Sequence, residues 1–310
     1  MTTLLFSHPA ALEHDMGPGH PERPDRYRAI AKGLAQDRFA GLKRREAPVA
    51  DRAPVLRVHP ESYVDRLAGA SPREGLIRLD ADTAMSPGSW EAALRAAGGA
   101  VAAVDAVMAG EAANAFVAMR PPGHHAERTT AMGFCFLNSA AIAARHAQGA
   151  HGAERVAIVD FDVHHGNGTQ HIFWDDASVM YASTHEMPLY PGTGARDERG
   201  AHDTIVNAPL SAGNDGAVFR EAMETAILPR LRNFAPDLII ISAGFDAHRL
   251  DPLGHLKLVG ADYGWVTGAL MEIADRSAKG RVVSVLEGGY SLEGLGESAS
   301  AHMAALMGGG

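Results

Sequence analysis

Six short apolar runs constrain the fold of this chain more than any other feature, because each is rich in β-branched residues and apolar through most of its length. The runs are TLLFS (3–7), NAFVAM (114–119), RVAIVDFD (155–162), SVMYAST (178–184), DLIIISAGFD (237–246) and RVVSVLEGG (281–289). A strand with one solvent-exposed face alternates apolar and polar residues, whereas a strand buried on both faces is apolar throughout, as in a parallel sheet. The runs therefore predict a mostly parallel central sheet that is covered on both faces.

Alanine-rich segments of helical composition separate the apolar runs. They cover roughly residues 25–37, 89–109, 138–149, 214–231, 259–277 and 293–307. Such alternation of strand and helix is typical of an α/β domain with helices on both faces of the sheet. A length of 310 residues could accommodate two domains, but single α/β domains often reach it, and a hydrophobic content of 46% suffices for one large core. We therefore expect a single α/β domain over residues 1–310.

Side chains that can bind metals or transfer protons follow four of the predicted strands. Asp160 and Asp162 close one run, Ser183 closes the next, Asp246 follows LIIISAGF, and Tyr290 follows VVSVLEGG. In open α/β sheets, ligands bind outside the carboxyl ends of the strands. Turn chemistry alone explains an aspartate or a glycine at any one strand end. Four segments of this kind together predict a functional site at that edge.

The segment DFDVHHGNG (160–168) predicts a metal centre. In an extended strand residues i, i+2 and i+4 share a face, so Asp160, Asp162 and His164 are expected to point the same way. Asp162 and His164, together with Asp246, would form an open three-ligand site like that of catalytic zinc. Two carboxylates and one imidazole also suit Fe²⁺ or Mn²⁺, so the spacing leaves the metal open. His165 is expected to face the other way, either as a buried hydrogen-bonded residue or with a catalytic task.

Six motifs occur in an order that resembles the zinc-dependent histone deacetylase family, which has the arginase–deacetylase fold. They are RPPGHHA (120–126), GFCFLN (133–138), DFDVHHGNGTQ (160–170), PGTG (191–194), GFDAHRLDPLG (244–254) and LEGGY (286–290). HPERPDR (20–26) resembles the N-terminal segment of the family, so the likeness covers nearly the whole chain. The form HHGNGTQ, with Asn167, is similar to the class II branch and to bacterial histone deacetylase-like amidohydrolases.

The resemblance implies a role for each matching residue. Asp162, His164 and Asp246 would hold Zn²⁺, with Fe²⁺ as the alternative metal in the cell. His124 and His125 would form a catalytic pair, with His125 as general base and then acid, and Tyr290 would polarise the substrate carbonyl. Asp160 would bond to His124 and Asn167 to His125. The substrate-binding residues would be Phe134, Tyr190, Leu253, Gly133 and Gly288. A structural K⁺ or Na⁺ would lie at Asp160, Asp162, His164, Ser183 and Thr184.

The implied reaction is hydrolysis of a linear amide: removal of an acetyl or other acyl group from the Nε amine of lysine. Leu253 stands where the eukaryotic polyamine-selective branch has glutamate, which favours an acyl-lysine substrate over acetylated polyamines or other small amides. Glu186 and the net charge of −9 could still attract a cationic substrate. Asp82 is either a rim acceptor for a peptide N–H or a helix cap, and Arg26 is either a channel arginine or a surface residue.

Two other classes of protein remain as alternatives. An inactive acyl-lysine binding module would lack a metal ligand, one of the paired histidines or the tyrosine, and all of these are present. An arginase-type hydrolase with two Mn²⁺ ions would carry further His and Asp ligands, and the HH and EGGY segments do not match that pattern.

Charge and cysteine content limit the partners and the cellular compartment that we expect for this protein. The net charge of −9 argues against non-specific nucleic-acid binding, and a single cysteine, Cys135, excludes an intrachain disulfide and fits a reducing compartment. MTTLLFSHPA has no basic n-region, and no apolar run approaches the roughly 18 residues of a membrane span. We expect a cytoplasmic protein without membrane or nucleic-acid partners, and a homo-oligomer is left open.

Overall fold

A computed structural model describes residues 2–308 and shows an α/β domain built on one eight-stranded sheet. The strands of this sheet are β1 (Thr3–Ser7), β2 (Lys43–Glu46), β5 (Asn114–Val117), β6 (Val156–Asp160), β7 (Val179–Glu186), β8 (Ile205–Leu210), β9 (Leu238–Ala243) and β10 (Val282–Leu286). Their order is β2-β1-β5-β10-β9-β6-β7-β8, and every neighbouring pair is parallel. A separate antiparallel pair is formed by β3 (Ile77–Arg78) and β4 (Ala84–Met85).

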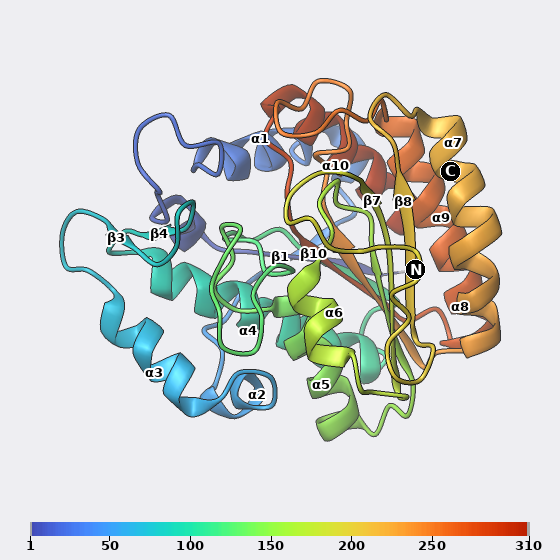
Figure 1. The fold of residues 1–310 in the computed structure, drawn as a ribbon, viewed down its shortest axis with the longest axis horizontal. Coiled ribbons are helices and arrows are strands. Elements are labelled where there is room, and N and C mark those ends of the chain that lie inside the picture. Colours follow the sequence, from blue (N-terminus) through green and yellow to red (C-terminus); the bar gives the residue numbers. More distant parts are fainter. Residues whose placement is uncertain (1, 309–310) are drawn as a thin grey trace.

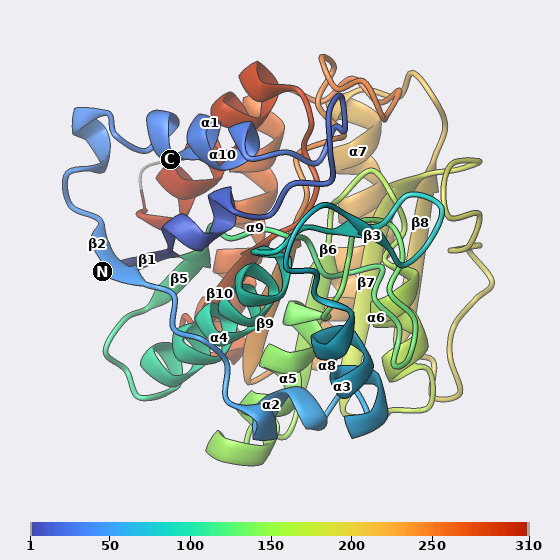
Figure 2. The ribbon, with the colours of Figure 1, turned by 90° about the vertical axis from the view of Figure 1, so that its left-hand side faces the viewer.

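Helices cover both faces of the sheet, as Figure 1 shows. The helices are α1 (Asp25–Gly33), α2 (Arg52–Leu56), α3 (Glu61–Ala70), α4 (Ser89–Met108), α5 (Ser139–His151), α6 (Asn167–Phe173), α7 (Gly216–Ala222), α8 (Leu228–Phe234), α9 (Gly260–Ser277) and α10 (Leu292–Leu306). One layer contains α4, α5 and α6, and the other contains α1 and α7 to α10. Figure 2, which looks onto the side of the sheet that carries α4, shows α2 and α3 in the lower part of the view, near α5. None of the helices in residues 2–308 is both long and apolar enough to cross a membrane.

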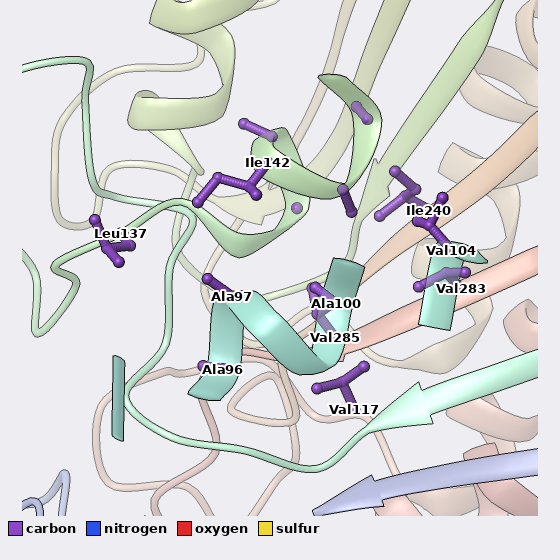
Figure 3. Packing of buried hydrophobic residues seen from close by; sticks show 14 of the residues in the cluster. Ala96, Ala97, Ala100, Val104, Val117, Leu137, Ile142, Ile240, Val283 and Val285 are labelled. Atoms are coloured by element: carbon purple, nitrogen blue, oxygen red, sulfur yellow. The ribbon is translucent and has the colours of Figure 1, made fainter. Parts of the chain in front are cut away.

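The strands are buried on both faces because alternate side chains enter two separate cores. Leu4 and Phe6 of β1 pack in the core beneath α4 and α5, while Leu5 between them packs in the core on the α9 side. Figure 3 shows the first core, where alanines of α4 face Val117, Val283 and Val285. These small side chains bring the helix close to the sheet. A Cβ added at Gly99 would lie 2.8 Å from Val117 Cγ1.

The expected fold class is confirmed, and all six apolar runs contain strands of the sheet. The pair β3 and β4 and two strands of the large sheet were not anticipated, and those two lie at its edges. The strand β2 has the sequence KRRE with every residue exposed, and β8 contains Pro209. Edge strands tolerate charge and proline because one side of their backbone needs no partner, so no continuous apolar run marks them.

Three expected boundaries were wrong. The helix expected over 25–37 ends at Gly33. The helix expected over 214–231 begins at Gly216 and ends at Phe234, and a π-helical turn (Met223–Ile227) lies between α7 and α8. Strand β6 ends at Asp160, because the Asp160 side chain accepts a hydrogen bond from the backbone N–H of Asp162 and the chain turns there. Asp162 and His164 therefore lie in a loop beyond the strand and do not share a strand face with Asp160.

Candidate active site

Three adjacent strands at the centre of the sheet deliver the residues of the site. β10, β9 and β6 are neighbours, so the segments that follow their carboxyl ends meet at one edge. These segments carry Tyr290 after β10, Asp246 after β9, and Asp162 with His164 after β6. The loop that follows β5, the other neighbour of β10, adds His124 and His125.

Asp162, His164 and Asp246 form a buried group whose ligand atoms lie within 4.8 Å of one another. Nδ1 of His164 is 3.1 Å from Asp162 Oδ1 and 3.2 Å from Asp246 Oδ2. Glycine backbone closes the group: a Cβ at Gly244 would lie 2.0 Å from Asp162 Oδ2, and one at Gly288 would lie 2.1 Å from Asp246 Oδ2. Only residues without a side chain allow this close approach. Two carboxylates and one imidazole in such a cradle fit a divalent metal ion.

The pKa shifts of these three residues follow from two carboxylates and one imidazole that are buried side by side. Burial and the Asp162 carboxylate raise the pKa of Asp246 to about 7. Burial also raises the pKa of Asp162, but the positive charges of His124 and His164 outweigh it and hold that pKa below its usual range. Burial lowers the pKa of His164, yet its hydrogen bonds with both carboxylates raise it to about 10. A metal cation held by these three residues would compensate the charge of the two carboxylates.

His124 and His125 lie side by side, with ring centroids 4.0 Å apart, and both are buried. Nδ1 of His124 is 3.0 Å from Asp160 Oδ2, and Nδ1 of His125 is 2.8 Å from Asn167 Oδ1. The two imidazoles thus have different partners: a carboxylate for the first and a neutral amide for the second.

The pKa values of the two imidazoles move in opposite directions. Burial lowers the pKa of His124, but the charges of Asp162, Asp160 and Glu287 outweigh it and raise that pKa well above its usual value. Burial lowers the pKa of His125 well below its usual value, and the neighbouring cations His124 and His164 lower it further. Near neutral pH the pair therefore consists of a charged His124 and a neutral His125.

The proton position on His125 follows from the orientation of Asn167. The Asn167 amide donates through Nδ2 to Glu127 Oε1 at 3.1 Å, so its oxygen faces His125. An amide oxygen can only accept, so Nδ1 of His125 must be the donor. The neutral ring consequently presents the lone pair of Nε2.

Tyr290 is held by its backbone and by a cation over its ring. Its N–H donates to Asp251 Oδ2 at 2.6 Å, and the Arg26 guanidinium lies 4.9 Å from the ring centroid. Arg26 also donates to the carbonyl oxygens of Gly289 at 2.6 Å and Glu287 at 2.5 Å. Burial raises the pKa of Tyr290 well above its usual value, so the hydroxyl keeps its proton.

The surface alternative for Arg26 is wrong, since its side chain is fully buried. Arg26 donates to Glu22 Oε1 at 2.9 Å, and Arg120 donates to the same carboxylate at 2.7 Å. This buried network connects the N-terminal segment to the loop that carries Tyr290.

Sequence reasoning missed Glu287 and Asp251. Glu287 Oε2 accepts the N–H groups of Gly123 at 2.6 Å and His124 at 3.0 Å, which fixes the loop that carries the paired histidines. The Asp251 carboxylate accepts from Tyr290, Ser291 and Leu253. Glu287 directly follows β10, so the strand-end rule that identified Tyr290 would also have found it.

A cavity of about 260 Å³ opens above these groups. Its lining consists of Asp82, His125, Gly133, Phe134, His164, Leu189, Tyr190, Leu253 and Tyr290. Phe134 adopts a φ of 69°, and a Cβ at the preceding Gly133 would lie 2.5 Å from the His125 ring. The tight turn at Gly133 thus places the Phe134 ring edge-on to Tyr290, with centroids 5.8 Å apart. On the other side the Tyr190 ring lies edge-on to His125 at 5.1 Å.

The structure decides between the alternative roles that the sequence left open for several other side chains. Asp82 lines the cavity and does not cap α4, whose N-cap is Gly88. Glu186 is buried and accepts hydrogen bonds from His255, so it does not present a free charge to a substrate. His165 is buried, with Nδ1 2.7 Å from Thr193 Oγ1 and Nε2 3.0 Å from Gln170 Oε1.

Ser183 and Thr184 lie in β7 next to the end of β6, and both are buried. Ser183 is the register partner of Asp160. The structure therefore places the strand-end residues Asp160 and Ser183 together, while Asp162 and His164 lie farther along the loop that follows β6.

Comparison with known proteins gives one consistent result. The family model described as histone deacetylase domain matches residues 20–306. A probable deacetylase of Archaeoglobus fulgidus is 41% identical over 303 residues, which cover 95% of this chain and 83% of the relative. The histone deacetylase-like amidohydrolase of Pseudomonas aeruginosa is 42% identical over 279 residues, which cover 88% of this chain and 73% of the relative. The crystal structure of the HDA15 HD domain matches with a TM-score of 0.94 and 39% identity, covering 99% of this chain and 90% of that domain.

Proposed function

This chain belongs to the histone deacetylase family of deacetylases and amidohydrolases, and from that membership we propose that it is a zinc-dependent enzyme that removes an acetyl or acyl group from the Nε amine of lysine. We propose that residues 1–310 act as one catalytic domain. The observation that carries the proposal is the floor of the cavity, where His125, His164 and Tyr290 converge. A metal-binding group, a neutral base and a protonated phenol are the three components that amide hydrolysis requires.

Asp162, His164 and Asp246 are the residues that would hold the metal. A bound Zn²⁺ would supply a water of lowered pKa and polarise the amide carbonyl. Fe²⁺ suits the same ligands, and it is the alternative metal in the cell. The support for a cation here is the glycine cradle and the buried pair of carboxylates, whose charge needs compensation.

His125 is the general base of the proposed mechanism. Its neutral ring presents the Nε2 lone pair to the cavity, so it can take a proton from the attacking water and later deliver one to the leaving amine. His124 carries a positive charge that stabilises the developing negative charge, and Asp160 keeps its ring oriented. The division of work between the two imidazoles follows from their partners.

Tyr290 is the proposed hydrogen-bond donor to the oxygen of the tetrahedral intermediate. Its hydroxyl keeps its proton, and its ring position is fixed by Arg26 from one side and by the Asp251 contact at its backbone. Loss of one such donor typically lowers kcat by about 100- to 1,000-fold.

The cavity walls support an acyl-lysine substrate. Phe134, Tyr190 and Leu253 present mainly apolar surface along the cavity, which suits an extended aliphatic chain whose amide lies at the floor. Gly133 keeps the backbone close to His125, and Gly288 keeps it close to the carboxylates of Asp162 and Asp246. Asp82 in the lining supports the second candidate, an acylated polyamine or another small acylated amine, because a carboxylate at the wall can bind an ammonium group.

We also propose a structural K⁺ or Na⁺ beside the active site. Asp160, Asp162, His164, Ser183 and Thr184 would provide its oxygen ligands, largely through backbone carbonyls. The pairing of Asp160 with Ser183 in adjacent strands supports this placement.

The experiment that tests the substrate is a side-by-side measurement of kcat/KM on an acetyl-lysine peptide and on an N-acetylated polyamine with the zinc-loaded chain. We expect a clear preference for the peptide. Preference for the polyamine would keep the chemistry and overturn the assignment of Leu253. Zinc binding without turnover of either compound would favour a module that binds acyl-lysine without cleaving it.

A further inference from the structure

A second group of metal-type ligands lies between α4 and α5, away from the cavity. Asp105 of α4 and His146 and His151 of α5 form this group, which we name the α4–α5 cluster. Asp105 Oδ1 is 2.7 Å from Nε2 of His146 and 2.6 Å from Nε2 of His151. We propose that the α4–α5 cluster is a binding site for a divalent transition-metal ion of the zinc type.

The donor set selects the class of metal. Two imidazole nitrogens and one carboxylate oxygen suit Zn²⁺, Ni²⁺ or Cu²⁺, whereas Ca²⁺ and Mg²⁺ prefer oxygen ligands alone. Both nitrogens already point at one carboxylate oxygen, and all three ligand atoms lie within 4.8 Å of one another. Rotation of the side chains around a central ion is therefore enough to coordinate it, and water can complete the coordination.

The ends of the two helices favour a cation at this position. His151 is the last residue of α5 and is followed by the C-cap Gly152, which has a φ of 68°, while Asp105 lies in the last turn of α4. The carboxyl end of a helix carries partial negative charge, so a carboxylate there is unfavourable and a cation is favourable. A bound metal ion would neutralise Asp105 and interact with both helix ends.

The three side chains differ in exposure, so that a metal ion could reach the cluster while one of its ligands stays fixed. The Asp105 side chain is 51% exposed, that of His151 is 24% exposed, and that of His146 is 10% exposed. His146 thus forms a fixed base for the site, and the other two ligands can be reached from solvent. Alanines of α4 pack closely in the core beneath, as Figure 3 shows, so the helix that carries Asp105 is held firmly.

Arg57 also contacts the cluster, and its guanidinium would compete with a bound metal ion. It donates to Nδ1 of His146 at 3.1 Å. Because a guanidinium can only donate, Nδ1 accepts, and Nε2 of a neutral His146 carries the proton that Asp105 accepts. A metal on Nε2 moves that proton to Nδ1, so Arg57 must turn away, and its exposed position permits this movement.

The α4–α5 cluster is independent of the proposed active site. α4 and α5 each end just before a strand begins, so their last turns lie at the amino edge of the sheet, opposite the edge that carries Tyr290 (Figure 1). A metal there joins two helices and contacts no residue of the cavity. Its role would be to clamp α4 to α5.

The test is a Zn²⁺ titration of the untagged, metal-stripped full chain by calorimetry, with native mass spectrometry to count bound ions. We expect two equivalents of Zn²⁺ in the wild type, and one equivalent in each of the single variants Asp105→Asn and His151→Gln. His202→Gln, which alters an exposed histidine outside the cluster, should still bind two. His164→Ala, which removes a ligand of the other group, should retain one equivalent and lose it when combined with His151→Gln.

The same variants distinguish failure of this proposal from failure of the proposed function. Turnover of an acetyl-lysine peptide should be unchanged in His151→Gln and Asp105→Asn, and Zn²⁺ should raise the thermal midpoint of His164→Ala but not of the double variant. A His164→Ala variant that binds no Zn²⁺ would overturn the proposal, because the α4–α5 cluster is intact in that variant. So would an undiminished second equivalent in both Asp105→Asn and His151→Gln, whatever the deacetylase assay shows.

Discussion

The buried group Asp162–His164–Asp246 and the α4–α5 cluster combine the same two kinds of ligand at opposite edges of one sheet. The first has two carboxylates and one imidazole, all buried, and it lies beneath a cavity. The second has one carboxylate and two imidazoles, and two of its three side chains are partly open to solvent. Ligand type is therefore a poor guide to what a metal would do in this molecule.

The surroundings make the difference. The buried group has a neutral imidazole, a charged imidazole and a protonated phenol nearby, and it lies beneath a cavity of about 260 Å³. Within residues 2–308, Arg57 contacts the α4–α5 cluster, and none of the residues that line the cavity belongs to the cluster. If both groups bind a metal as proposed, the proton-transfer groups beside the buried one would make it catalytic, whereas the partly exposed one would serve for binding alone.

The largest expected effect separates the two groups by activity. His164→Ala should reduce deacetylation of an acetyl-lysine peptide to background, because it removes a ligand beneath the cavity, while His151→Gln should leave it unchanged. The measurement is kcat/KM after loading both variants with Zn²⁺. Equal activity in the two variants would mean that the buried group is not the catalytic centre.

Removal of the proposed base should have the next largest effect. His125→Ala should lower kcat by about 100- to 10,000-fold, the usual contribution of general acid–base catalysis. His146→Gln is the matched control, since it removes another buried imidazole that lies outside the cavity. A His125→Ala enzyme as active as that control would exclude His125 as the base.

The pH dependence should reveal the partner of His125. Burial and neighbouring cations hold the His125 pKa below its usual value, so the acid limb of kcat/KM should lie below pH 6.5. Asn167→Asp places a carboxylate 2.8 Å from Nδ1, which favours the charged imidazole and raises its pKa. Protonation then removes the base at a higher pH, so the acid limb should move upward. A profile that stays in place would show that Asn167 does not tune this residue.

Asp251 is expected to act by positioning Tyr290 and not by touching the substrate. Asp251→Asn weakens the acceptor for the Tyr290 N–H and should lower kcat about tenfold with little change in KM, because a displaced donor loses transition-state contact. Combined with Tyr290→Phe it should add almost nothing, since both changes remove one interaction. Full additivity of the two losses would contradict the positioning role.

The smallest effect concerns selectivity. Leu253→Glu adds a carboxylate to the cavity lining and should shift the ratio of kcat/KM toward an N-acetylated polyamine by about tenfold. Leu253→Gln controls for size and polarity. If both variants shift the ratio equally, charge at this position does not select the substrate.

The sequence predicted the interior of the fold well because the strands buried on both faces are apolar through most of their length. It failed at β2 and β8, whose exposed or proline-containing sequences satisfy no apolar pattern. The π-helical turn between α7 and α8 was also missed, because no local sequence signal distinguishes it from an α-helical turn.

The residues at the strand ends could be predicted because topology brings carboxyl ends together whatever the loops do. The buried residues that hold these side chains in place could not be predicted. Glu22 binds Arg120 across nearly a hundred residues of sequence, and Arg26 reaches the loop before Tyr290 from the opposite end of the chain. Such contacts depend on packing, and no spacing in the sequence records them. The α4–α5 cluster was missed for the same reason, since Asp105 and His146 lie on different helices.

The measurement that tests the central claim most directly is kcat/KM of the zinc-loaded chain on an acetyl-lysine peptide, compared with Tyr290→Phe. We expect clear turnover by the wild type and a loss of about 100- to 1,000-fold in the variant, because the phenol hydroxyl is the proposed donor to the reacting oxygen. Equal rates in the two proteins, or no release of acetate by a wild type that has bound zinc, would contradict the account.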